Sequence, residues 1–218
     1  MADYKEQYGP SIPPPYNPNR SSNCLCCFFK VLITLIILLG LACLIAYFII
    51  RPRPFTFHVT NANLTQFDYN TNKKTLDYNL VLNFTASNPN RMLSLYYDFV
   101  EANAYYQELR FSLLDLIKRE DNLLRQSPKS TIQMSGVFKG QQLLFLDESQ
   151  LSEFDREESH GVFNIFVRLD LNIRLKLGRL TVGKSKSTTA KCPIKVALSG
   201  NDGKIVSPFE TIECNVKV

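Results

Sequence analysis

A continuous apolar run near the N-terminus is the first feature of the hydrophobic pattern. The twenty residues from Val31 to Ile50 carry no charged side chain, and Lys30 and Arg51 bound them. At about 1.5 Å per residue, a helix of that length spans the ~30 Å hydrocarbon core of a bilayer. A cleaved signal peptide is the alternative, but the run is too long, begins late in the chain and is followed by no small-residue cleavage site. The pattern therefore predicts an uncleaved membrane-spanning helix over residues 28–50.

After Pro54 the apolar residues recur at every second position. This alternation is clearest from Leu76 to Ser87 and from Gly161 to Leu177, and it is typical of strands with one buried and one wet face, as antiparallel sheets have. Further strands are expected near 55–67, 92–100, 102–112 and 131–138, whereas 141–158 breaks the alternation and predicts a loop or short helix. Seven or eight such strands predict an all-β, antiparallel fibronectin-III/immunoglobulin-like β-sandwich over residues 55–218.

The C-terminal pattern predicts a disulfide. Cys192 and Cys214 each lie on the apolar side of an alternating run, and Gly200-Asn201-Asp202-Gly203 between them is a strong turn signal. A hairpin centred on Gly203 places the two cysteines directly opposite each other, which is close enough for a bridge in an oxidising compartment. Two separately buried thiols are the alternative, because Ser207-Pro208 in the returning strand would shift the register.

The orientation of the predicted span depends on features other than charge, because basic residues flank it about equally. Asn63-Leu64-Thr65 and Asn83-Phe84-Thr85 are glycosylation acceptors on the C-terminal side. On the N-terminal side, S-acylation candidates precede the span at Cys24, Cys26 and Cys27. Together with the predicted disulfide, these features favour a cytosolic N-terminus and an extracellular C-terminal domain.

The segments that flank the span have their own composition. Residues 1–27 are predicted to be a disordered, Pro/Tyr-rich cytosolic tail, and residues 51–54 a juxtamembrane linker. Pro13-Pro14-Pro15-Tyr16 fits a WW-domain ligand, although a solvated proline-rich tail explains the same four residues. Within the span, Ala42 and Ala46 with Gly40 form a small-residue face that would let two helices approach into a homo-oligomer, although chance spacing in an apolar run explains the same residues.

Composition narrows the chemistry. The net charge is +5, from 25 Lys and Arg against 20 Asp and Glu, which is too mild to indicate nucleic acid as a partner. Only two histidines are present, and no nucleophile elbow, zinc motif, phosphate loop or dinucleotide fingerprint occurs. The sequence therefore predicts no enzyme activity, no cofactor and no metal.

One group of basic residues suggests a binding face. Between Arg168 and Lys195 the only acidic residue is Asp170. The basic residues of this stretch are Arg168, Arg174, Lys176, Arg179, Lys184, Lys186, Lys191 and Lys195. If these side chains share one sheet face, that face would attract an anionic polymer or lipid headgroups. A solubilising sheet surface is the alternative.

Several short stretches, in their order and spacing, carry a resemblance to a known family. They are Asn88-Pro89-Asn90-Arg91, Tyr96-Tyr97-Asp98, Ala104-Tyr105-Tyr106, Phe138-Lys139-Gly140-Gln141, Gly161-Val162-Phe163-Asn164-Ile165, Lys176-Leu177-Gly178, and the closing Cys192 and Cys214. Over nearly its whole length the chain resembles the plant harpin-induced-like family, which is related to the non-race-specific disease resistance proteins. Its extracellular domain is of the late embryogenesis abundant group-two class.

The resemblance implies a plant plasma-membrane protein whose expression pathogens, senescence or abiotic stress raise, with a fibronectin-III-like sandwich and no known catalysis. An Asn-Gly-Asp adhesion motif of some relatives is not matched, since this chain has Asn201-Asp202-Gly203.

We therefore expect a non-enzymatic, single-pass plasma-membrane protein that acts as an accessory of plant defence and stress signalling through contacts with other membrane or signalling proteins. The alternative is a structural or protective domain that binds acidic cell-wall polysaccharide or membrane lipids. A third hypothesis is a lipid-handling module with a groove between its sheets.

Overall fold

The computed structural model describes residues 9, 22–50, 53–118, 124–199 and 209–217. The chain divides into two compact units, residues 1–49 and 50–218, which are described separately. The first contains the helix α1 (Ser22–Ile50). The second contains β1 (Thr56–Asn70), β2 (Thr75–Asn88), β3 (Leu93–Tyr106), β4 (Leu109–Ile117), β5 (Leu124–Gln126), β6 (Ser130–Leu143), α2 (Glu148–His160), β7 (Val162–Leu177), β8 (Leu180–Ala197), β9 (Ile212–Glu213) and β10 (Asn215–Lys217).

The helix α1 begins earlier than the sequence predicted. It starts at Ser22 rather than at residue 28, so residues 22–27 belong to the helix and not to the tail. No proline or glycine lies between Ser22 and Lys30, so nothing in the sequence interrupts the backbone hydrogen bonds there. The 23 residues from Cys26 to Phe48 are long and apolar enough to cross a membrane, which is compatible with a single-pass anchor.

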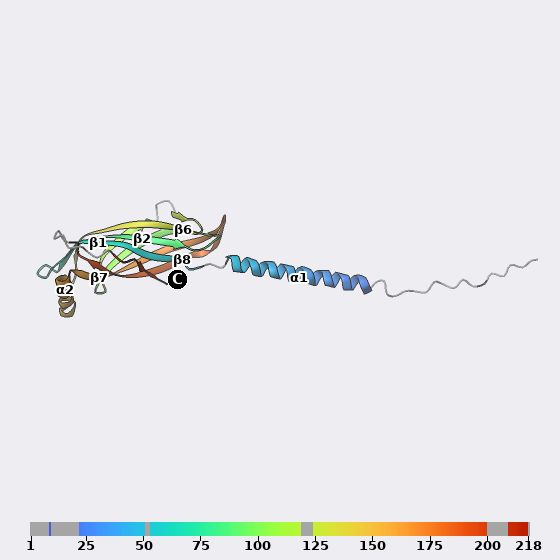
Figure 1. Ribbon diagram of the computed structural model, residues 1–218, viewed down its shortest axis with the longest axis horizontal. Helices are drawn as coiled ribbons and strands as arrows, with labels where there is room; N and C mark the ends of the chain where they lie inside the picture. Colours follow the sequence, from blue (N-terminus) through green and yellow to red (C-terminus); the bar gives the residue numbers. More distant parts are fainter. Residues whose placement is uncertain (1–8, 10–21, 51–52, 119–123, 200–208, 218) are drawn as a thin grey trace, which may run out of the picture. The chain divides into compact units, whose positions relative to one another are not determined.

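Two antiparallel sheets form the second unit, as Figure 1 shows. One sheet has the strand order β6-β2-β1-β9, and the other has the order β10-β8-β7-β3-β4, with β5 added beside β3. Every strand pairing in the two sheets is antiparallel. The sandwich predicted from the alternation is therefore confirmed, with ten described strands instead of seven or eight.

The predicted alternation of apolar residues is the alternation that the core uses. In β2, every second side chain from Leu76 to Ala86 is buried, and the same holds in β7 from Phe163 to Ile173. Burial of each large aliphatic or aromatic side chain contributes about 1.5–3 kcal/mol. These two strands therefore supply a large part of the hydrophobic stabilisation of both sheets.

Two strand boundaries differ from the prediction. The stretches expected at 92–100 and 102–112 are instead β3, which continues to Tyr106, and β4, which begins at Leu109. The turn between them is Gln107-Glu108, and both residues have positive φ, 47° and 66°. A turn of this kind usually carries glycine or asparagine, so the residue types at these two positions did not indicate it.

The stretch 141–158, predicted to be a loop or short helix, contains the end of β6 and most of α2. Asp147 caps the helix by accepting hydrogen bonds from the backbone of Gln150 and from Ser149. These hydrogen bonds, the one from the Gln150 backbone foremost, lower the pKa of Asp147. Gly161 ends the helix with φ of 68°, in the left-handed region that glycine adopts without strain.

The predicted disulfide between Cys192 and Cys214 is present, with a Cα–Cα distance of 4.4 Å. The returning chain, however, is not one strand paired with β8. Ile212–Glu213 pairs with β1 in one sheet, and Asn215–Lys217 pairs with β8 in the other. The bridge therefore lies where the chain passes from one sheet to the other. The predicted turn at 200–203 and Ser207-Pro208 lie outside the described residues.

We expect the double variant Cys192→Ala/Cys214→Ala to lose about 3 kcal/mol of unfolding free energy, because the bridge closes a loop with a sequence separation of 22. Denaturant unfolding of the full chain in detergent, followed by circular dichroism, measures the loss. A reductant should destabilise the parent chain by the same amount and leave the double variant unchanged. Equal stability of the oxidised and reduced parent chain would contradict the expected role of the bridge.

Candidate functional site: an interaction surface

The outer face of the larger sheet carries most of the polar side chains that were singled out from the sequence. On this face side chains of β3 and β7 form ion pairs. Arg168 Nε donates to Asp170 Oδ2 at 3.0 Å, and the Arg174 guanidinium lies 2.6 Å from Asp98 Oδ1. Asn103 Nδ2 bridges two carboxylates by donating to Glu101 and Asp170. The face is therefore a network of paired charges.

The predicted basic face is consequently only partly formed. Asp98 and Glu101, both from β3, add acidic groups that the stretch 168–195 does not contain. Lys176 lies over the ring of Tyr96, with Nζ 4.4 Å from the ring centroid, and Arg179 lies in the exposed turn after Gly178. Lys191 and Lys195 are exposed, opposite Arg168 and Asn164 of β7.

Lys186, another predicted member of the basic face, does not join it. Lys186 pairs with Ile173, a buried position, so it lies on the opposite side of β8 from Lys191. The cause is the alternation itself, because β8 pairs with β7 without interruption from Lys186 to Lys191 and residues an odd number of positions apart face opposite sides. The side chain of Lys184 lies outside the described residues.

A small hollow on this face combines aromatic and basic side chains. It has a volume of about 230 Å³ and is lined by Tyr105, Glu108, Phe166, Arg168 and Lys191, which we call the aromatic–basic patch. The Arg168 guanidinium lies 5.3 Å from the centroid of the Tyr105 ring, and the rings of Tyr105 and Phe166 are 6.0 Å apart. Such rings can stack on a sugar or an aromatic side chain, while the cations attract a carboxylate.

The sequence analysis missed the aromatic part of this patch. Tyr105 and Phe166 occupy outward positions of β3 and β7, opposite each other in the pairing of the two strands. The sequence signal for this patch was an aromatic residue at a solvent-facing position of each alternating strand. Only the register of β3 against β7 shows that the two rings lie together.

Both predicted glycosylation acceptors lie in the smaller sheet. Asn63 is exposed in β1, and its Oδ1 accepts a hydrogen bond from Ser199 Oγ at 2.9 Å. It borders a pocket of about 400 Å³ that Lys195 and Glu210 also line. Asn83 is half-buried in β2 and pairs with Asn61 and Ser135. Asn63 is therefore the more accessible of the two.

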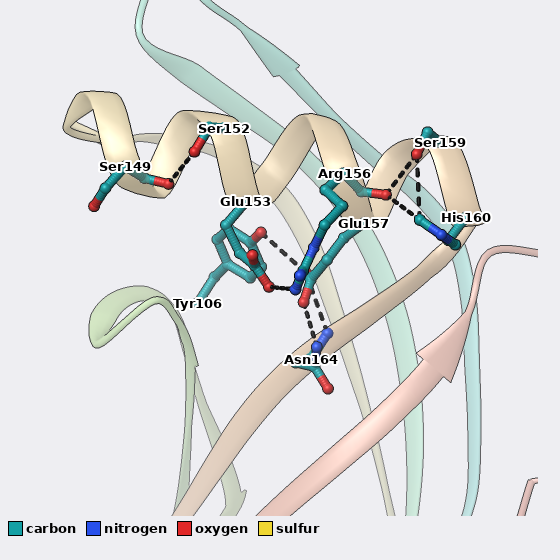
Figure 2. A network of polar contacts seen from close by, with 9 residues as sticks. All are labelled: Tyr106, Ser149, Ser152, Glu153, Arg156, Glu157, Ser159, His160 and Asn164. Carbon is teal, nitrogen blue, oxygen red and sulfur yellow. Dashed lines mark hydrogen bonds and ion pairs between the residues drawn. The ribbon is translucent and has the colours of Figure 1, made fainter.

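A buried carboxylate attaches α2 to the sandwich, as Figure 2 shows. Glu157 accepts a hydrogen bond from Tyr106 Oη at 3.0 Å and others from the side chain and backbone of Asn164. The pKa of Tyr106 is raised, mainly by burial and secondly by the adjacent Glu157 carboxylate. The phenol therefore stays protonated and donates its hydrogen bond. The Glu157 carboxylate and the Tyr106 phenol are buried, and the cluster positions the helix.

The remaining predicted sites lie on α1 or outside the described residues. Cys26 and Cys27 are exposed on α1, and Cys24 belongs to the same helix. Pro13, Pro14, Pro15 and Tyr16, the proposed WW ligand, lie outside the described part of the chain. Among the residues that the structure describes, no group of three or more His, Cys, Asp or Glu side chains could hold a metal ion.

These features define a class of protein with one helix long enough to span a membrane and an antiparallel β-sandwich closed by a disulfide. Three proteins of Arabidopsis thaliana are similar to the chain over most of its length. NDR1/HIN1-like protein 10 is 38% identical and covers 90% of this chain and 88% of its own. NDR1/HIN1-like protein 3 is 36% identical over 99% of both chains, and NDR1/HIN1-like protein 2 is 30% identical over 95% of this chain and 93% of its own.

The chain therefore belongs to the NDR1/HIN1-like family, which confirms the resemblance found in the sequence. No family model matches the chain. Among solved structures, a protein from Archaeoglobus fulgidus is 10% identical, covers 65% of this chain and 98% of its own, and has a TM-score of 0.31. That likeness is too low to support an argument, so the fold assignment rests on the strand pairing itself.

We expect Tyr106→Phe to lower the free energy of unfolding by about 1–2 kcal/mol, because it removes a hydrogen bond to a buried carboxylate. Tyr105→Phe is the matched control, since the adjacent Tyr105 is partly exposed and its hydroxyl bonds to no described residue. Denaturant unfolding followed by circular dichroism measures both variants. Equal stability of the two would show that the contact with Glu157 contributes nothing.

Proposed function

We propose that this chain is a non-enzymatic, single-pass plasma-membrane protein that acts in plant defence and stress responses through protein contacts. In this proposal α1 spans the bilayer, the N-terminus is cytosolic and the β-sandwich lies outside the cell. The observation that carries the proposal is the aromatic–basic patch, because it is an exposed, concave cluster on an otherwise charge-paired face. Membership of the NDR1/HIN1-like family supports the link to defence, because the resemblance implies a protein whose expression pathogens and stress raise.

The disulfide supports the proposed topology. Cys192 and Cys214 are both buried and bridged, and such bridges persist in oxidising compartments, not in the cytosol. The exposed Asn63 on the same domain is accessible to the glycosylation machinery if that domain is translocated.

We expect the full chain, expressed in plant membranes, to carry a glycan on Asn63. Asn63→Gln should then increase gel mobility by one glycan, whereas Asn83→Gln should change the mobility less or not at all, because Asn83 is half-buried within a strand. Treatment with a glycosidase should abolish the difference between Asn63→Gln and the parent chain. An unglycosylated protein with reduced Cys192 and Cys214 would contradict the proposed topology.

The residue types of the patch fit a protein partner. Tyrosine and arginine are enriched among the residues that dominate binding energies at interfaces. Tyr105 and Arg168 are held together by a cation–π contact, and Asp170 fixes the guanidinium, so few rotamers are lost on binding.

The same patch supports a second candidate function, binding of acidic cell-wall polysaccharide. Two neighbouring rings offer a stacking surface for a sugar, and the exposed Lys191 beside Arg168 offers charge for a uronate carboxylate. The two candidates differ in salt dependence, because binding through surface charge weakens at high ionic strength.

We expect Tyr105→Ala to reduce the recovery of co-purified partner proteins about tenfold or more, as loss of a central interface residue does. Lys191→Glu tests the charge of the patch, and Lys139→Glu, the same change at an exposed site on β6, is its matched control. Affinity purification of the full chain from plant membranes at low and high salt, with quantitative mass spectrometry, measures recovery.

Partners that survive high salt and are lost only in the patch variants support protein contacts. Salt-sensitive binding of polygalacturonate that Lys191→Glu removes and Lys139→Glu preserves supports the polysaccharide instead. Unchanged recovery of every partner and of the polymer in Tyr105→Ala and Lys191→Glu would contradict both functions for the patch.

A further inference from the structure

Three turns lie together at one end of the sandwich. The pairing of Leu93 with Leu177, and of Leu177 with Leu180, brings the turn before β3 beside the turn between β7 and β8. The turn before β6 joins them, because the backbone N–H of Lys129 donates to the carbonyl of Asn90 at 2.9 Å. We call the exposed residues of these turns the basic rim: Arg91, Met92, Lys129, Arg179 and Leu180.

The basic rim combines unpaired cations with exposed apolar side chains. Arg91, Lys129 and Arg179 are exposed, and none forms an ion pair with a described residue. Met92 is 48% exposed and Leu180 is 71% exposed. Residues 87–95, 125–131 and 176–182, which build this end of the sandwich, contain no acidic side chain. Among the described residues of this end, unlike on the outer face of the larger sheet, no carboxylate offsets the charge.

The opposite end of the sandwich has the opposite charge. There α2 carries five acidic residues, Glu148, Glu153, Asp155, Glu157 and Glu158, against the single base Arg156. An anionic surface would therefore attract the basic rim and repel the α2 end. The charge distribution alone is enough to orient the domain on such a surface.

The stretch of chain between the apolar helix and the sandwich is short. Asn90 holds Arg53 on the sandwich by two hydrogen bonds, from Arg53 N to Asn90 Oδ1 at 2.6 Å and from Asn90 Nδ2 to Arg53 O at 3.0 Å. Only four residues lie between Arg53 and Phe48, the last residue of the potential span. Even fully extended, the chain from Phe48 to Arg53 reaches at most about 18 Å. The length of this connection therefore limits how far Arg53 can lie from the potential span.

We propose that the basic rim docks on the surface of the bilayer that anchors the chain. Met92 and Leu180 enter the interface between headgroups and acyl chains, while Arg91, Lys129 and Arg179 bind phosphates of anionic phospholipids. Arginine suits this role because its planar guanidinium binds phosphate through two hydrogen bonds. The proposal rests on the proposed membrane anchor, and it assigns the α2 end and the aromatic–basic patch to partners away from the bilayer.

A fluorescence experiment tests the docking directly, because the chain contains no tryptophan. Leu180→Trp in the full chain, reconstituted into nanodiscs of phosphatidylcholine and phosphatidylglycerol, places a single probe on the rim. Phe145→Trp is the matched control, since Phe145 is 69% exposed and follows β6 near α2, at the other end. Tyr47→Trp, within the potential span, reports insertion of the helix itself.

We expect the probe at 180 to show blue-shifted emission and quenching by brominated lipids, and the probe at 145 to show neither. The added substitutions Arg91→Glu, Lys129→Glu and Arg179→Glu should reduce quenching at 180 to the level of the control. These sites are exposed, and intact circular dichroism and an intact Cys192–Cys214 bridge would verify folding.

The possible results separate docking from anchoring. Quenching at 47 without quenching at 180 would overturn the docking and leave the anchor in place. Absence of quenching at 47 would overturn the anchor and the docking that rests on it. Equal quenching at 180 in pure phosphatidylcholine, unaffected by the charge reversals, would overturn the role assigned to the three cations.

Discussion

Alternate side chains of β2, β3 and β7 are buried against one another between the two sheets, and this shared burial is the constraint on which the other features depend. Because successive side chains of a strand point to opposite faces, burying one set leaves the other set in water. The outer faces are therefore free to carry charge and function. The same constraint fixes the register that brings Tyr105 opposite Phe166, and Cys192 close to Cys214.

Near α2 the core is mainly aromatic, and this part of the core attaches the helix. The Phe67 ring lies within 4.8–6.0 Å, between centroids, of the rings of Tyr106, Phe111, Phe154 and Phe163. Phe154 belongs to α2, so the helix contributes a side chain to the sandwich core as well as the Glu157 carboxylate that Tyr106 binds. A short acidic helix with few apolar residues is thus held by one ring and one buried polar cluster.

Charge is distributed unevenly over the surface that this core supports. The outer face of the larger sheet neutralises its arginines with Asp98 and Asp170, whereas the basic rim has no carboxylate among its described residues. Paired charges contribute solubility and positioning, while unpaired charges beside exposed apolar side chains are typical of a surface that binds something. The two ends and the patch are therefore separate surfaces that differ in charge.

The sequence by itself determined the elements whose pattern is local: the apolar helix, the alternation in β2 and β7, the two cysteines on the buried side, and the family. It missed the Gln107-Glu108 turn, because neither residue is typical of one. Only the tertiary structure decided which charges meet. β3 brought Asp98 to Arg174, 76 residues further along the chain. Periodicity is a property of neighbours in sequence, but partners across strands depend on register, which the packing of the whole sandwich sets.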